Sequence, residues 1–145
     1  EKQIEWALEY RLPIVIHARD AFDYIYKVMG PYKNTPLTGI FHSFTGTVEE
    51  AAKLLEFDGF MLGINGVVTF KKSTLPEVLP TVPLERVVLE TDSPYLTPVP
   101  NRGKRNESAN VKDTLAKVAE IYQMPSEYVA QVTSENALKV FGFRK

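Results

Sequence analysis

Three short apolar runs in this chain each end in a residue that can bind a metal ion. The runs occupy residues 13–17 (PIVIH), 39–42 (GIFH) and 87–92 (VVLETD). A continuous apolar run without polar alternation predicts a strand that is buried on both faces, as in a parallel sheet. In α/β folds, the carboxyl ends of such strands carry the ligand site. The runs therefore predict a parallel sheet that brings two imidazoles and a carboxylate to one edge.

The rest of the chain alternates between expected helices and strands. Thr47 and Glu50 match a capping box, and Gly142 matches a helix stop. Successive strand ends lie roughly 22–28 residues apart, close to the spacing of βα units in a barrel. We expect helices over residues 1–11, 21–29, 48–55, 75–79, 111–122 and from 126 onward, the last one continuing or breaking near Thr133, and strands that end at His17 and His42 or cover 60–64 and 87–89.

This alternation predicts parallel strands joined by right-handed crossovers. Four such units make half of a TIM (β/α)₈ barrel, and we expect residues 1–145 to form that half as one domain. The chain opens on a helical period with no Met, which favours a piece of a longer protein. The rival architecture is an open doubly wound sheet, but no glycine-rich phosphate fingerprint follows any of the strands.

Composition limits the function classes. The net charge of −1 excludes a basic coat for nucleic acid, so any phosphate binding must be local. The absence of cysteine excludes disulfides and thiolate metal sites, which suits the cytoplasm, where we expect the protein. The apolar runs are far too short to span a membrane, and no signal-peptide pattern opens the chain.

His17 and His42 are the only two histidines of the chain. Either one alone is better explained as a hydrogen-bonded residue at a strand end, but their shared position favours metal ligands. A carboxylate that ends an apolar strand is costly unless it is paired or metal-bound, so Asp92 is predicted as a ligand and catalytic residue rather than a turn Asp before proline. Glu90 shares its face of the strand and is expected to support the ligands or form a buried pair.

Four further residues are candidates for binding substrate phosphate: Arg19, Arg102, Arg105 and Asn106. The alternative for the arginines is solvated loop charge, which is the better explanation for Lys104. Asn106 has an equally good alternative, the capping of a turn. Gly63 and Gly66 flank the end of a strand, but their spacing is too weak to predict a phosphate loop.

Several motifs together resemble those of the TatD-type metal-dependent deoxyribonucleases. They are residues 16–21 (IHARDA), 41–46 (FHSFTG), 63–66 (GING), 89–96 (LETDSPYL), 101–107 (NRGKRNE) and 133–137 (TSENA), in the same order and spacing. The resemblance implies an amidohydrolase-type barrel of which this chain is the C-terminal half, with His17, His42 and Asp92 as ligands. It also implies further ligands, a His-x-His pair and a Glu, on strands that this chain lacks. Ser108 and Ala18 depart from the usual Pro and Ser, and neither position supplies a ligand.

The expected function is hydrolysis of DNA phosphodiester bonds by a water that one or two divalent ions activate. Mg²⁺, Mn²⁺ and Zn²⁺ all remain open, although imidazole ligands favour Zn²⁺ or Mn²⁺. The expected partners are a DNA substrate and the N-terminal half of the same protein, while the oligomeric state stays open. Two alternatives remain: an ester or amide hydrolase, such as an aminoacyl-tRNA deacylase, and a non-catalytic half-barrel that binds a partner.

Overall fold

The computed structural model describes residues 1–142. Its four strands form one parallel sheet in the order β1-β2-β3-β4. The strands are β1 Ile14–His17, β2 Gly39–His42, β3 Phe60–Ile64 and β4 Val87–Leu89. Because the spatial order follows the chain order, this sheet has no reversal of the kind that defines a doubly wound sheet. The prediction of an α/β fold with four βα units, half of a TIM barrel, is confirmed.

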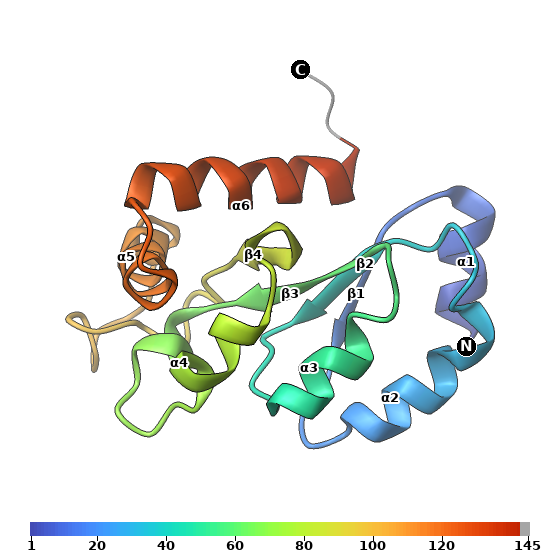
Figure 1. Ribbon diagram of the computed structural model, residues 1–145, viewed down its shortest axis with the longest axis horizontal. Coiled ribbons are helices and arrows are strands. Elements are labelled where there is room, and N and C mark those ends of the chain that lie inside the picture. Colours follow the sequence, from blue (N-terminus) through green and yellow to red (C-terminus); the bar gives the residue numbers. More distant parts are fainter. Residues whose placement is uncertain (143–145) are drawn as a thin grey trace.

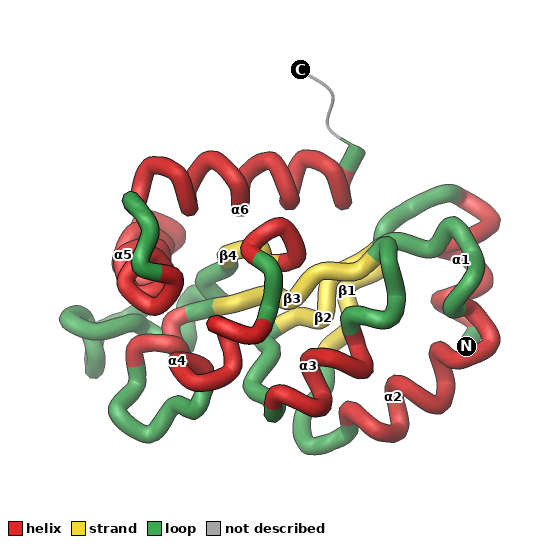
Figure 2. The backbone as a smooth tube through the Cα atoms, viewed as in Figure 1, coloured by secondary structure: helices red, strands yellow, loops and turns green. Residues whose placement is uncertain are grey.

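Helices cover both faces of the sheet (Figure 1), and the same layers are visible in the backbone trace (Figure 2). α2 and α3 lie on one side, and α6 crosses the other side near β4. The α-helices are α1 Lys2–Tyr10, α2 Phe22–Met29, α3 Val48–Leu54, α4 Leu75–Val78, α5 Val111–Tyr122 and α6 Ser126–Phe141. Short 3₁₀ turns are η1 Gly30–Tyr32, η2 Gly66–Thr69, η3 Leu79–Thr81, η4 Leu84–Arg86 and η5 Ser108–Asn110. No helix within residues 1–142 is long and apolar enough to cross a membrane.

Local signals set most helix ends as expected. The capping box is present, since Thr47 accepts from the Glu50 backbone N–H and the Glu50 side chain accepts from the Thr47 N–H. Gly142 ends α6 in the left-handed conformation, with φ 68°. α6 runs through Thr133 without a break, and the Thr133 hydroxyl donates to the Val129 carbonyl one turn back, at 2.8 Å.

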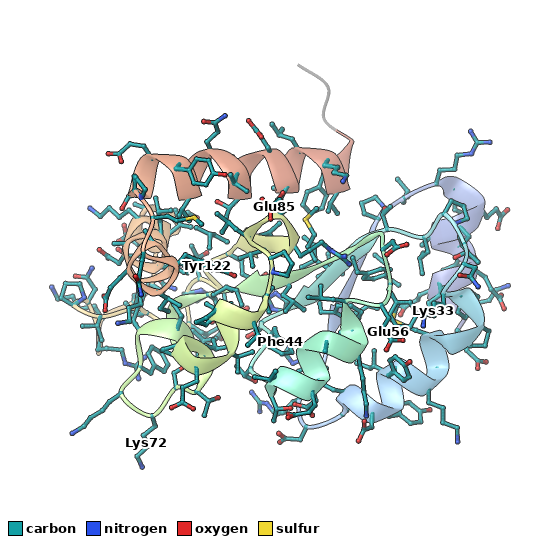
Figure 3. The ribbon with its side chains drawn as sticks, in the orientation of Figure 1. Lys33, Phe44, Glu56, Lys72, Glu85 and Tyr122 are labelled. Atoms are coloured by element: carbon teal, nitrogen blue, oxygen red, sulfur yellow. The ribbon has the colours of Figure 1, made fainter. Side chains whose placement is uncertain are left out.

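The two faces of the sheet bury different sets of side chains, because successive residues of a strand point to opposite sides. One face holds the main core, in which Phe41, Leu62 and Val87 pack with buried residues of α2, α3 and α5. Phe44, labelled in Figure 3, belongs to this core. It is 1% exposed, and its ring centroid lies 5.3 Å from that of Phe22.

The second face carries a smaller apolar row. Ile40, Met61 and Val88 pack there under Val140 of α6. His42, Gly63 and Glu90 lie on the same face, each two residues after a member of this row and at the carboxyl end of its strand. His17 of β1 lies beside His42. The fold therefore places a polar row at the edge where parallel α/β sheets hold their ligands.

Candidate metal centre

The structure brings the three predicted ligands to one edge of the sheet. His17 and His42 are register partners on β1 and β2, and their ring centroids lie 5.5 Å apart. His42 Nε2 lies 3.2 Å from Asp92 Oδ1. His17 is exposed and makes no hydrogen bond or ion pair within residues 1–142, so both of its ring nitrogens are available.

Asp92 reaches His42 through a turn that follows β4. Its backbone lies in the left-handed region, with φ 58°, which Asp tolerates better than most residues. Its carbonyl oxygen accepts from the Tyr95 N–H at 2.9 Å, which closes the turn. About a third of the Asp92 side chain is exposed, and Oδ2 has no partner within residues 1–142. One carboxylate oxygen therefore faces the imidazole and the other faces solvent.

Glu90 holds the other side of the His42 ring. His42 Nδ1 lies 2.8 Å from Glu90 Oε2, and the Ser43 backbone N–H donates to Glu90 Oε1. An ionised carboxylate can only accept, so the proton of the first bond belongs to Nδ1. With that single proton on the ring, the Nε2 lone pair faces Asp92 Oδ1, and a second ring proton or a metal ion would bridge these two atoms.

Two residues of this network, Ser43 and Asn65, were absent from the predicted site. Asn65 Nδ2 donates to Ser43 Oγ at 2.8 Å, and Asn65 Oδ1 accepts from the Val67 N–H at 3.1 Å. Asn65 is 2% exposed. The motif GING marked this segment in the sequence, but nothing local to it indicated a bond to a residue 22 positions earlier.

The predicted phosphate-binding arginines differ in how they are held. Arg19 and Arg105 are exposed and have no hydrogen bond or ion pair within the described residues. Arg102 stacks on the Phe70 ring, with Cζ 4.0 Å from the ring centroid, and donates to the Thr97 carbonyl at 3.3 Å. Stacking leaves the outer edge of its guanidinium open. All three cations follow the carboxyl ends of strands in the chain.

Asn106 differs from its prediction as a phosphate-binding residue. It is 2% exposed, and its amide N–H groups donate to the Thr91 and Tyr95 carbonyls at 2.8 and 2.6 Å. Its Oδ1 accepts from the Glu107 N–H and from Asn110 Nδ2. The amide has no capacity left for a ligand, so Asn106 holds the turn around Asp92 in place.

Replacing Asn106 by Ala is expected to lower the free energy of unfolding by about 2–4 kcal/mol, because the four hydrogen bonds of this buried amide are lost. Chemical denaturation of the variant and of wild type measures the difference. Lys104→Ala is the control, since its exposed side chain makes no interaction within residues 1–142. A change below about 0.5 kcal/mol, the range of ordinary surface substitutions, would contradict the assigned role.

The donors at this edge fit a divalent ion in part. Imidazole nitrogen and carboxylate oxygen are ligands of Zn²⁺ at about 2.0–2.2 Å, so two ligands of one ion lie roughly 3.0–3.4 Å apart. The separation of 3.2 Å between His42 Nε2 and Asp92 Oδ1 matches that spacing. However, residues 1–142 contain no group of three or more His, Asp or Glu side chains that could hold an ion. The described residues therefore do not present a complete set of ligands for an ion.

A sheet of parallel βα units with imidazoles and a carboxylate at its carboxyl edge places the chain among α/β barrel proteins with strand-end metal sites. The family model described as TatD related DNase matches residues 1–142. The chain therefore belongs to the TatD family.

Two curated relatives show the extent of the match. An uncharacterized metal-dependent hydrolase of Bacillus subtilis, YabD, is 41% identical over 96% of this chain and 54% of its own length. An uncharacterized metal-dependent hydrolase of Escherichia coli K12, YcfH, is 39% identical over 95% of this chain and 52% of its own. The chain thus spans about half the length of these relatives.

Solved structures agree with the fold. YJJV, a TatD homolog from Escherichia coli, superposes with a TM-score of 0.91 at 26% identity, over 99% of this chain and 55% of its own. A TatD family hydrolase from Entamoeba histolytica superposes with a TM-score of 0.81 at 21% identity, which speaks for the fold alone.

Proposed function

We propose that this chain is part of a metal-dependent hydrolase, about twice its length, that cleaves phosphodiester bonds of DNA. The observation that carries the proposal is the approach of His42 Nε2 to Asp92 Oδ1 at 3.2 Å, with Glu90 on the opposite ring nitrogen. A divalent ion between these two atoms would bind the Nε2 lone pair and the carboxylate at the same time. The names of the relatives YabD and YcfH as metal-dependent hydrolases support the same class.

His42 and Asp92 would share one ion, and His17, at the same edge of the sheet, would bind that ion or a second one only together with ligands from the rest of the protein. A bound divalent ion lowers the pKa of a coordinated water and polarises a phosphoryl oxygen. Asp92 Oδ2 has no partner within residues 1–142, and in this proposal it would accept the proton of the attacking water. Glu90 keeps the His42 ring in one orientation throughout.

The cations favour a nucleic-acid substrate over a small neutral ester or amide. Arg19 and Arg105 are exposed and unpaired within residues 1–142, and Arg102 is supported by Phe70. Guanidinium groups bind phosphate oxygens through charge-assisted hydrogen bonds. A small neutral acyl substrate would make no use of three such groups, whereas the phosphates of an aminoacyl-tRNA would, so the assay below has to separate that substrate from DNA. DNA, which carries a phosphate on both sides of the scissile bond, would use them all.

Cleavage of a fluorescent single-stranded and duplex DNA oligomer by the full-length protein tests the proposal. The assay is run with Mg²⁺, Mn²⁺ and Zn²⁺ in turn, each with a chelator control, and beside an aminoacyl ester. Chelator-sensitive cleavage of DNA is the expected result. Turnover of the ester without cleavage of DNA would reject the proposed substrate class and keep the hydrolase.

Replacing Arg102 by Ala is expected to lower kcat/KM on DNA about 10-fold or more, since a hydrogen bond to a charged group contributes about 1.5–3 kcal/mol. The affinity for Mn²⁺ should stay nearly unchanged, because Arg102 touches none of the proposed ligands. Lys139→Ala is the control, a cation on the exposed side of α6. Unaltered kinetics on DNA would place Arg102 among the solvated charges.

A further inference from the structure

The carboxyl group of Glu90 occupies the space where a side chain at position 63 would begin. A Cβ placed on Gly63 would lie 2.7 Å from Glu90 Oε2, 2.8 Å from Cδ and 2.9 Å from Oε1. Real Cβ atoms essentially never approach other atoms this closely. Glycine is therefore the only residue type that leaves room for the Glu90 carboxyl group beside position 63 of β3; we call this space the slot.

The slot exists because three strands are in register. Gly63 is the partner of Val88 on β4, and the Glu90 N–H donates to the Ile64 carbonyl at 3.0 Å. On the other side, the Phe44 N–H donates to the Gly63 carbonyl at 3.0 Å. The backbone of β3 is thus tied to the residues after β2 and β4, and the Glu90 side chain lies across it toward His42.

The Glu90 carboxylate faces two donors, His42 Nδ1 and the Ser43 N–H, and the second of these is fixed by its own neighbours. Ser43 lies in the left-handed region, with φ 53°, and its hydroxyl accepts from the buried amide of Asn65. This conformation aims the Ser43 N–H at Glu90 Oε1. With both oxygens engaged and only 19% of its side chain exposed, Glu90 has one position, and that position sets the His42 ring.

We propose that Gly63 is a positioning residue, which acts through Glu90 to fix the His42 imidazole with Nδ1 bonded and Nε2 turned toward Asp92. The proposal rests on the proposed function, because it makes His42 a ligand that is oriented before the ion binds. A larger residue at position 63 would push the carboxyl group off His42 and free the ring to turn. The displaced atoms are the end of a flexible side chain, so the fold should tolerate the change.

The test compares Gly63→Ala with wild type in the full-length protein without metal. Crystal structures report the Nδ1–Oε2 distance, and ¹⁵N spectra of the histidine rings report which nitrogen carries the proton. We expect the His42–Glu90 bond to be lost, and the affinity for Mn²⁺, measured by calorimetry, to fall about 10–100-fold, as for other residues that orient metal ligands. Gly30→Ala is the matched control, since nothing lies within 4 Å of its added Cβ.

A double-variant cycle separates action through Glu90 from a general structural effect. In a Glu90→Ala background the added methyl at position 63 meets no carboxyl group, so Gly63→Ala should cause no further loss of Mn²⁺ affinity. An equal loss in both backgrounds, or an unmoved His42 ring in the single variant, would overturn the proposal. A wild-type protein that binds Mn²⁺ but cleaves no DNA would instead reject the proposed function, and the ring measurements would still stand.

Discussion

Replacing Asp92 by Asn in the full-length protein should lower metal-dependent cleavage of DNA by about 10²–10⁴-fold, the range for loss of a positioned general base. The change keeps the shape of the side chain but removes the charge that faces His42 Nε2 at 3.2 Å. The amide also cannot take the proton of the attacking water. The affinity for Mn²⁺ should fall in the same variant, because one ligand loses its charge.

The measurement is kcat/KM on a DNA oligomer at saturating Mn²⁺, with Mn²⁺ affinity determined separately. Asp58→Asn is the control: it removes the same charge from an exposed residue that has no hydrogen bond or ion pair within residues 1–142. Thermal unfolding of both variants shows whether the fold is kept. An Asp92→Asn protein with activity within a few-fold of wild type would remove Asp92 from the catalytic machinery.

The second large effect concerns the chain by itself. Residues 1–145 alone are expected to show no metal-dependent cleavage of DNA above background, because residues 1–142 contain no group of three metal-binding side chains. A water misplaced by even about 1 Å can cost about 100-fold in rate. The relatives are about twice as long, and we expect the remainder to supply the further ligands.

The edges of the sheet support this expectation. β1 and β4 each pair with one neighbour only in the described part of the chain. A groove beside β1 is lined by Ile4 of α1, Val28 of α2 and His17, and Val15 on this strand is 55% exposed. Open edges with exposed apolar residues are ready to pair with further strands.

The experiment adds the remaining part of the protein, in cis or as a separate chain, to residues 1–145 and follows cleavage of a fluorescent DNA with and without chelator. Activity should return only when both parts are present. Gel filtration of the separate chains reports whether they associate. Robust chelator-sensitive cleavage by residues 1–145 alone would show that fewer ligands suffice than we propose.

Local signals predicted the elements well, because their causes are local. The apolar runs that became β3 and β4 were identified to the residue, and so was α5. The capping box at Thr47 was visible because its two partners are three residues apart. The helix break that the sequence left open near Thr133 is absent. Whether a threonine interrupts a helix depends on the side chains that pack around the threonine, which the local sequence does not show.

The sequence predicted the site only to the extent that it predicted where the strands end. The sequence by itself determined that His17, His42 and Asp92 follow apolar strands, and parallel pairing then brings such ends to one edge. Only the tertiary structure decided what each side chain contacts. Asn106 makes its hydrogen bonds within the loop, Gly63 leaves space for the Glu90 carboxyl group, and Asn65 donates to the Ser43 hydroxyl. The roles of Gly63 and Asn65 depend on register between segments 22 to 48 residues apart, and that of Asn106 depends on a loop that closes over 11 to 15 residues. A short motif carries no information about the atoms that the fold brings opposite it.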